Sequence, residues 1–262
     1  MGGATWSGVC EAYRRSFAGL CAGTIDVLVA DTRGPEHLDV GCGTGDLALH
    51  AARAGRHVTA VDPVPEMVAR TRETTRGLDV VAARGGLPDL PLPGDRFDGV
   101  TANFVINHVP DPRAAVRELA RVVRGGGSVA VTVWTDRPTA QARLFSQSLA
   151  AADAIVVPGL RPDPDLDFER SLDGLAGILR QAGLVPRVCR ELVWDWEVPW
   201  ESLWAGIAAG VASIGATYLA QTDTVRRRIE EEMHERARAL EVDGLVHLPS
   251  RAAYVLADKA LR

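Results

Sequence analysis

The 262-residue chain has few cysteines and a single lysine, Lys259. Its four cysteines are Cys10, Cys21, Cys42 and Cys189, and none of them stands in a CxxC motif or at the Cys/His spacing of a zinc site. We therefore expect neither a structural zinc ion nor a disulfide framework. The sequence also lacks carboxylate pairs and histidine clusters at metal-ligand spacing, so we expect no metal.

The chain also lacks long apolar runs and long basic runs. No run reaches the roughly 20 apolar residues of a membrane-spanning helix, and the N-terminal stretch MGGATWSGVCEAYRRSF has polar and charged residues where a signal peptide has apolar ones. We therefore expect a cytoplasmic protein that binds no membrane. A formal charge of −5 with an isoelectric point of about 5.7 argues against a nucleic-acid partner.

The hydrophobic content of 47% predicts a folded protein, whose length is close to the upper size of a single core. Between residues 36 and 134, short β-branched apolar runs alternate with Ala/Arg/Leu-rich stretches of helical periodicity. This alternation is typical of βαβ units on a parallel sheet. The predicted strands are 37–40, 57–61, 79–82, 97–103 and 128–134, and the predicted helices between them are 45–54, 65–76 and 112–123.

The flanking regions predict a helical lid, a helical insertion and one more pair of strands. Residues 1–34 are expected to form the lid, with apolar side chains at helical spacing. Helices at 139–157 and 171–182 are expected to flank the loop RPDPDLDF. The core domain is expected to comprise residues 35–198 and to end with a strand at 188–198. Helical segments within 199–241 then belong to an insertion, 199–250, that covers the substrate, before the last strand at 251–259 within the segment 251–262.

The stretch HLDVGCGTGDLALHAARAGRHVTAVD contains the clearest ligand signal. Gly41, Gly43 and Gly45 connect a predicted strand to a predicted helix, where glycine lets backbone N–H groups approach a negatively charged group. The following strand ends at Asp62, where a carboxylate can accept hydrogen bonds from both hydroxyls of a ribose. Together these features predict a ligand that contains a nucleoside.

The glycine spacing distinguishes between two classes of nucleoside ligand. A dinucleotide-binding G-x-G-x-x-G motif would have its third glycine at position 46, where this chain has Asp46. The spacing is G-x-G-x-G instead, which disfavours an NAD-dependent oxidoreductase.

Five ordered motifs extend this pattern: LDVGCGTG, AVDPVPEM, LPDLPLPGDRFDGV, NFVINHVPDPRAAVRELARVVRGGG and SVAVTVW. Through them residues 36–135 resemble the class I S-adenosylmethionine-dependent methyltransferases, in particular the small-molecule, ubiquinone/menaquinone-type branch with a methyltransferase domain 11. The resemblance implies an α/β, Rossmann-like fold whose seven-stranded, mostly parallel sheet has an antiparallel last strand. It also implies S-adenosylmethionine as cofactor and S-adenosylhomocysteine as product.

The resemblance also assigns roles to residues around the cofactor. The backbone at the three glycines would hold its methionine part, Asp39 its ammonium group and Asp62 its ribose. Gly86 and Leu87 stand where the family has an Asp and its neighbour, so here the chain departs from the pattern. The remaining cofactor residues would be Pro63 and Met67 beside the adenine, Asn103 and Phe104 at the methionine side, and Tyr13 on the lid.

Several of these residues have a structural alternative. Asp39 is also consistent with a turn cap, and Asn103 with a hydrogen bonder at the end of a strand. Met67 and Tyr13 are also consistent with core packing.

His108 is the candidate catalytic base, because it follows the fourth predicted strand at the end where open α/β sheets bind ligands. Its alternative role is to orient the loop or contact the cofactor. His37, His50 and His57 are expected to be structural or surface residues. A candidate acceptor pocket consists of tryptophans that either wall a hydrophobic site or fasten the insertion to the sheet. They are Trp134, Trp194, Trp196, Trp200 and Trp204.

We therefore expect a methyltransferase of secondary metabolism that acts on a small, apolar or aromatic metabolite or natural product, through oxygen, nitrogen or carbon. The alternatives keep the fold and the cofactor. One is a non-methylating reaction, either a cyclisation or aminocarboxypropyl chemistry, and the other is a non-catalytic protein that binds S-adenosylmethionine. We expect a monomer or a homodimer.

Overall fold

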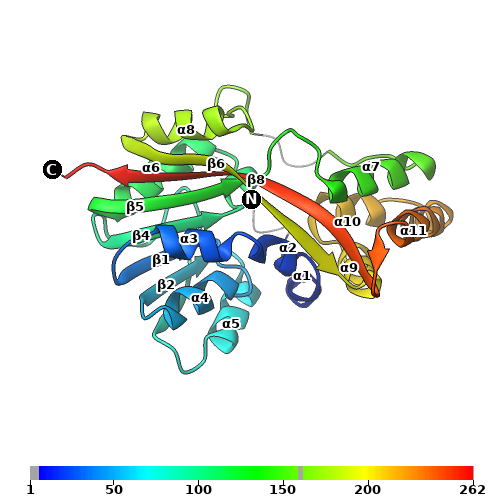
Figure 1. Cartoon of the computed structure of the whole chain (residues 1–262), viewed down its shortest axis with the longest axis horizontal. Coiled ribbons are helices and arrows are strands. Elements are labelled where there is room, and N and C mark those ends of the chain that lie inside the picture. The colour runs from blue at the N-terminus through cyan, green and yellow to red at the C-terminus, as the bar shows by residue number, and fades with distance from the viewer. Residues whose placement is uncertain (1–5, 159–161, 262) are drawn as a thin grey trace.

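The computed structural model describes residues 6–158 and 162–261 (Figure 1). Within these residues an eight-stranded sheet has the order β3-β2-β1-β4-β5-β8-β6, and the short β7 pairs with β8. The strands are β1 (Glu36–Val40), β2 (His57–Asp62), β3 (Val80–Arg84), β4 (Phe97–Asn103), β5 (Val123–Val133), β6 (Leu184–Val198), β7 (Glu241–Val242) and β8 (Leu245–Lys259).

Strands β1 to β5 are parallel, and β8 runs antiparallel to both β5 and β6. The expected seven-stranded, mostly parallel sheet with an antiparallel last strand is thus confirmed, with the two-residue β7 added at β8. The order reverses beside β1, and in open α/β sheets ligands bind at the carboxyl ends of the strands at such a point.

The described helices are α1 (Cys10–Arg15), α2 (Phe17–Ala22), α3 (Ile25–Asp31), α4 (Asp46–Arg53), α5 (Pro65–Thr74), α6 (Pro112–Val122), α7 (Ala140–Ala151), α8 (Leu172–Gln181), α9 (Trp200–Ala208), α10 (Ala212–Leu219) and α11 (Asp223–Arg238), with a 3₁₀ turn at η1 (Ile106–His108). Apart from α1 and α2 at the N-terminal end, the described helices belong to three groups. Helices α3 to α5 cover one face of the sheet and α6 and α8 the other, while α7 and α9 to α11 form a separate body (Figure 1).

The β6–β8 ribbon is longer than its sequence suggests. The register joins Leu184 to Lys259 at one end and Val198 to Val246 at the other. Residues 245–250, which we expected in the helical insertion, belong to β8, and residues 184–187 belong to β6. Trp196 and Leu248 are buried beneath the helices of the separate body, while Asp195 and Pro249 are exposed, so the strand alternation continues beyond the main sheet.

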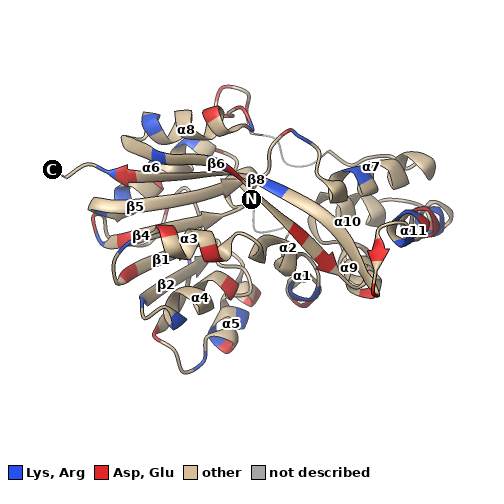
Figure 2. Cartoon of the chain, in the orientation of Figure 1, with Lys and Arg blue, Asp and Glu red and all other residues tan. Residues whose placement is uncertain are grey.

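The separate body, which we call the cap (α7 and α9 to α11), has its own apolar core. Leu203, Ile207, Ile229 and Met233 are fully buried in it. Both signs of charge are interspersed along α11, and charge is sparse on α9 and α10 (Figure 2). Among the described helices, none is by itself long and apolar enough to cross a membrane. Helices α9 and α10 meet that test only as a pair, which is bent by 63°.

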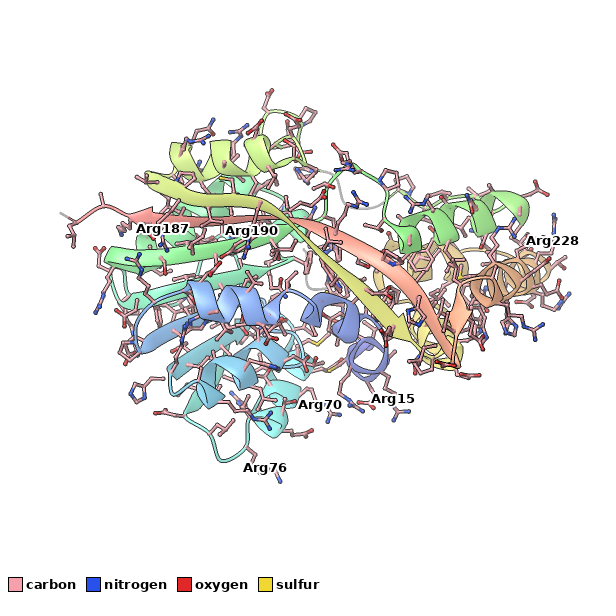
Figure 3. The ribbon with its side chains drawn as sticks, viewed as in Figure 1. Arg15, Arg70, Arg76, Arg187, Arg190 and Arg228 are labelled. Carbon is pink, nitrogen blue, oxygen red and sulfur yellow. The ribbon has the colours of Figure 1, made fainter. Side chains whose placement is uncertain are left out.

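The N-terminal segment consists of three short helices rather than one long one. Its first five residues lie outside the described residues, as do Arg161 of the RPDPDLDF loop and the last residue of the chain. Glu11 of α1 forms ion pairs with Arg15 and with Arg70 of α5. Hydrogen bonds from Arg14 and Arg15 lower the pKa of Glu11 to about 2. Arg15 and Arg70 extend on the same side of the molecule (Figure 3).

Gly23, directly after α2, lies against the ring of Trp194 on β6. Its backbone (φ −61°) suits any residue, yet a Cβ there would lie 2.2 Å from Cδ1 of Trp194. The indole N–H of Trp194 is buried and has no acceptor among the described residues. Glycine is therefore required here by the packing of the tryptophan ring and not by the backbone conformation.

We predict that Gly23→Ala destabilises the fold by about 1–3 kcal/mol, because the indole ring must shift in a packed environment. Thermal unfolding measures the effect as a lowered Tm. Gly177→Ala in α8 is the matched control, because its Cβ meets nothing within 4 Å and alanine favours a helix interior. Equal Tm values for wild type and Gly23→Ala would contradict this account of the contact.

Candidate functional site

The glycine loop between β1 and α4 has the backbone that its sequence predicts. Gly41, Gly43 and Gly45 all have positive φ, at 69°, 52° and 90°. Both Gly41 and Cys42 donate their backbone N–H to the carbonyl oxygen of Val61, at 2.8 and 3.0 Å. The loop is thereby held against the end of β2.

Two of the three glycines are also required by their neighbours. A Cβ at Gly41 would lie 2.5 Å from a methyl group of Val105, and one at Gly45 would lie 3.0 Å from the Cα of Thr71. A Cβ at Gly43 would meet only the ring of Tyr13, at an ordinary 3.5 Å. Among the three glycines, Gly43 is thus the one that lies against the N-terminal segment.

Asp62, at the end of β2, binds the glycine loop directly. Its Oδ2 accepts a hydrogen bond from the backbone N–H of Gly43 at 3.0 Å, and its Oδ1 accepts one from Val64 at 2.9 Å. Burial raises the pKa of Asp62 to about 6 against the opposing effect of these two donors. Each oxygen of a carboxylate has a further lone pair, so the side chain can still accept from ligand hydroxyls.

Asp39, at the carboxyl end of β1, is a buried carboxylate without a full set of partners. It is 1% exposed. Its Oδ1 lies 3.4 Å from the Thr101 hydroxyl, and its Oδ2 has no hydrogen-bond partner among the described residues. Burial, opposed by the hydrogen bond from Thr101 and aided by the nearby Asp62 and Asp46, raises the pKa of Asp39 to about 7. Because burying an unpaired charge is costly, this oxygen fits a positively charged ligand group.

A small cavity of about 40 Å³ adjoins Asp39 and the glycine loop, and Tyr13, Cys21 and Asn103 also line it. Ligand pockets for small molecules typically measure about 300–1,000 Å³. The N-terminal helices therefore fill space that a nucleoside ligand would need. Tyr13 is enclosed there, and burial raises its pKa well above the ordinary value, while burial raises the pKa of Cys21 to about 12.

Asn103, at the end of β4, joins the N-terminal segment to the sheet. Its Oδ1 accepts hydrogen bonds from the hydroxyls of Thr24 and Thr132, at 2.8 and 2.5 Å, and its Nδ2 donates to the carbonyl oxygen of Cys21 at 3.0 Å. In this structure the Asn103 side chain thus fastens the segment that covers the glycine loop.

The residues expected beside an adenine lie after β2 and β3. A Cβ at Gly86 would lie 3.1 Å from Cβ of Pro63, so the two residues are adjacent. Met67 is buried. Leu87 follows Gly86 and packs against the core between the sheet and α6. The structure therefore brings Pro63 and Gly86 together at the carboxyl ends of β2 and β3.

The five tryptophans of the predicted acceptor pocket lie in three different places. Trp134 stacks on Phe104 with ring centroids 4.0 Å apart, and Trp194 lies 6.0 Å from Trp134 and 6.2 Å from Phe104. Trp196 is buried against Phe17. The last two belong to the cap, where Trp200 stacks with Trp204 and with His234.

Phe104, Trp134 and Trp194, which we call the aromatic cluster, lie directly beside Asn103. Phe104 has a positive φ of 58°, which is uncommon for a bulky residue. Its backbone N–H donates to both the carbonyl oxygen and the hydroxyl of Thr132, at 3.2 and 3.0 Å. These hydrogen bonds hold the strained backbone that turns the Phe104 ring onto Trp134.

His108 lies in η1, in edge-on contact with Trp6 at 5.4 Å, and Trp6 contacts Tyr13 in the same way at 5.7 Å. Protein surrounds the ring while part of it remains exposed. This crowding and, to a smaller extent, the nearby Arg170 lower the pKa of His108 to about 4. The preceding Asn107 orients the loop through two hydrogen bonds with the backbone of Trp134.

A cluster that no sequence spacing indicated lies on the exposed face of the β6–β8 ribbon. Among the described residues, ligand atoms of Asp195, Glu197 and His247 lie within 4.8 Å of one another. Asp195 and His247 form an ion pair at 2.6 Å. Side chains alternate along β6, so this cluster lies on the face opposite Trp194 and Trp196.

Comparison with known proteins identifies a domain of one family. A model described as "Methyltransferase domain" matches residues 38–131. A ubiquinone biosynthesis O-methyltransferase of Xanthomonas euvesicatoria is 37% identical over 158 residues, which cover 58% of this chain and 63% of that protein. An uncharacterised protein of Mycobacterium tuberculosis is 36% identical over 105 residues, or 39% of this chain and 38% of that protein. The chain thus spans about three-fifths of the ubiquinone biosynthesis O-methyltransferases that it matches.

Solved structures show the same fold over most of the chain. The YcgJ protein of Bacillus subtilis has a TM-score of 0.57 at 21% identity, covering 91% of this chain and 99% of that protein. The [4+2]-cyclase SpnF has a TM-score of 0.57 at 22% identity, covering 94% of this chain and 82% of that protein. These likenesses establish the fold, as the sequence motifs predicted.

The raised pKa values of the two buried carboxylates predict how stability depends on pH. Their pKa values in the folded protein, about 7 for Asp39 and about 6 for Asp62, lie above the ordinary value of 3.8. The stability that the two protonated carboxyl groups give the folded protein is therefore fully present below about pH 4. It is lost as the pH rises toward 7. We expect Asp39→Asn to have a Tm close to that of wild type at about pH 4, and a Tm that exceeds that of wild type by several degrees at pH 7.5.

Thermal unfolding of both proteins at a series of pH values measures this difference. Asp26→Asn is the control, because Asp26 is exposed on α3. A Tm difference between Asp39→Asn and wild type that stays constant from pH 5 to 7.5 would contradict the burial of an ionisable Asp39.

Proposed function

We propose that this protein transfers a methyl group from S-adenosylmethionine to a small aromatic or apolar acceptor. The match of residues 38–131 to a methyltransferase domain supports this proposal. The observation that supports the proposal most directly is Asp39, whose buried Oδ2 has no partner among the described residues and adjoins the glycine loop. An ammonium group would supply the missing charge and hydrogen bond.

The cofactor, when bound, would supply an electrophilic methyl group on a sulfonium. The chain's task is then to bind and orient, since orientation can contribute roughly 7–11 kcal/mol to such a reaction. Asp62 has free lone pairs for the ribose hydroxyls while it holds Gly43. Gly43 lines the cavity together with Tyr13, and methyl transfer is favoured in a site from which water is excluded.

On the acceptor side, the aromatic cluster favours a flat, apolar ring. Its members come from the ends of β4 and β5 and from β6, and they lie beside Asn103. The relatives named as ubiquinone biosynthesis O-methyltransferases support oxygen of a phenol-like ring as the accepting atom. His108 would accept the proton of that hydroxyl, and its lowered pKa keeps the imidazole neutral at physiological pH.

Ligand binding is the first test of the cofactor. The Tm is measured with S-adenosylmethionine, S-adenosylhomocysteine or NADH, each added alone. A ligand at 100 times its Kd adds about 2.7 kcal/mol, or several degrees at this size. We expect stabilisation by the two sulfur nucleosides only. Stabilisation by NADH alone would overturn the proposal in favour of an oxidoreductase.

Turnover is the second test, with phenolic acceptors and release of S-adenosylhomocysteine as the readout. We predict that His108→Ala lowers kcat about 10²-fold with little change in the affinity for S-adenosylmethionine. His57→Ala is the control, because His57 is exposed at the opposite end of the sheet. The His108-dependent part of the rate should rise with pH through about 4 and be constant from pH 6 to 8.

Two results would overturn parts of this proposal. If kcat of His108→Ala is unchanged while the cofactor binds more weakly, His108 contacts the cofactor and is not the base. If the cofactor is bound and no methylated acceptor forms, a cyclisation or another non-methylating role replaces methyl transfer.

A further inference from the structure

A chain of buried polar side chains leads from Arg56, after α4, to Asp39 at the glycine loop. Arg56 Nη1 lies 2.9 Å from Nδ1 of His37, His37 Nε2 lies 3.1 Å from the Thr101 hydroxyl, and that hydroxyl lies 3.4 Å from Oδ1 of Asp39. His37 and Thr101 are fully buried. Four polar groups thus form a continuous path under α3 and α4.

The register of the sheet explains why these side chains meet. His37 and Asp39 are two residues apart on β1, so they share one face. Thr101 on β4 pairs directly with Asp39, and Gly99 pairs with His37. A Cβ at Gly99 would lie 3.1 Å from Nδ1 of His37. The glycine therefore leaves the space that the imidazole ring fills.

Arg56 fixes which atoms donate and which accept along this series of hydrogen bonds. A guanidinium has no acceptor, so Arg56 must donate to Nδ1 of His37, and that nitrogen has no proton. The proton of the neutral imidazole is then on Nε2, which donates to Thr101. Burial and Arg56 lower the pKa of His37 to about 3, which agrees with a neutral ring.

Arg56 is itself fixed at the end of α3. Its guanidinium donates to the hydroxyl of Thr32 at 2.7 Å, to the carbonyl oxygen of Thr32 at 2.8 Å and to that of Val29 at 2.5 Å. With these acceptors and His37 it has four hydrogen bonds. Arg56, the first of these hydrogen-bonded side chains, is thus held rigidly.

The Thr101 hydroxyl has one hydrogen and two acceptors within reach. The carbonyl oxygen of Leu38 lies at 3.3 Å and Oδ1 of Asp39 at 3.4 Å. His37 already donates to this hydroxyl, so its own hydrogen is available to one of these two oxygens. An ionised carboxylate is the stronger acceptor, so ionisation of Asp39 directs the hydrogen to Oδ1.

We propose that Arg56, His37 and Thr101 are positioning residues that hold Oδ1 of Asp39 and thereby aim its Oδ2 at the ammonium group of the cofactor. This inference rests on the proposed function. A carboxylate that is held at one oxygen loses less conformational freedom when it binds a cation. The series of hydrogen bonds from Arg56 to Asp39 should therefore increase affinity for ligands that have the ammonium group.

The test compares two ligands and two variants of Thr101 by isothermal titration calorimetry. S-adenosylmethionine has the amino-acid part, whereas 5′-methylthioadenosine has the same nucleoside and lacks it. Thr101→Val removes the hydroxyl at nearly constant shape, and Thr101→Ser keeps it. We expect Thr101→Val to raise the Kd for S-adenosylmethionine about tenfold and that for 5′-methylthioadenosine less than twofold. Thr101→Ser should bind both ligands like wild type.

A second pair of variants tests the imidazole. His37→Leu breaks both of its hydrogen bonds and should behave like Thr101→Val. His37→Gln offers a carbonyl oxygen to Arg56 and an amide N–H to Thr101, as the assigned tautomer does, and should restore most of the affinity. Binding of 5′-methylthioadenosine shows in each case that the variant has folded.

Three outcomes are distinct. Unchanged affinity of Thr101→Val for S-adenosylmethionine would overturn the positioning role. An equal loss for both ligands would also overturn it, because the effect would then be a general structural one. Wild-type protein that binds neither ligand would overturn the proposed function itself.

Discussion

The site depends on two carboxylates buried at the ends of adjacent parallel strands. Asp62 and Asp39 lie where the strand order of the sheet reverses, and burial opposes ionisation of both. Their partners differ, because Asp62 accepts two backbone N–H groups while Asp39 has one oxygen without a partner among the described residues. Asp62 therefore shapes the loop, and Asp39 keeps an oxygen that would bind a cationic group under the proposed function.

The N-terminal segment completes this site and also restricts it. Asn103 and the Gly23–Trp194 contact hold the segment against the sheet, and Glu11 joins it to α5. The remaining cavity of about 40 Å³ is too small for a nucleoside. If a nucleoside binds here as proposed, the segment must move aside for it. Exposed ion pairs such as Glu11–Arg70 contribute little to stability, so they oppose this movement only weakly.

Most of the parallel sheet and the glycine loop could be predicted, because local periodicity and glycine spacing determine them. The start of β8 at Leu245 could not, since its pairing with β6 joins residues far apart in the sequence. Neither could the separation of the tryptophans, because positions 194 and 196 share a face of β6 and still pack against different elements. His37 looked like a structural or surface residue, and only the pairing of β1 with β4 reveals its contact with Thr101.

The residues of the proposed cofactor site and those of the proposed acceptor site lie in different parts of the chain. Asp39, Asp62 and the glycine loop all lie within the matched domain, residues 38–131. Trp134, Trp194 and the cap lie outside it. The aromatic cluster joins the two parts, because Phe104 belongs to the domain and stacks on Trp134. The strained backbone of Phe104 sets the position of this ring. Under the proposed function, acceptor choice should therefore depend on how β6 presents Trp194 to the Phe104 ring, which Thr132 of β5 holds in place.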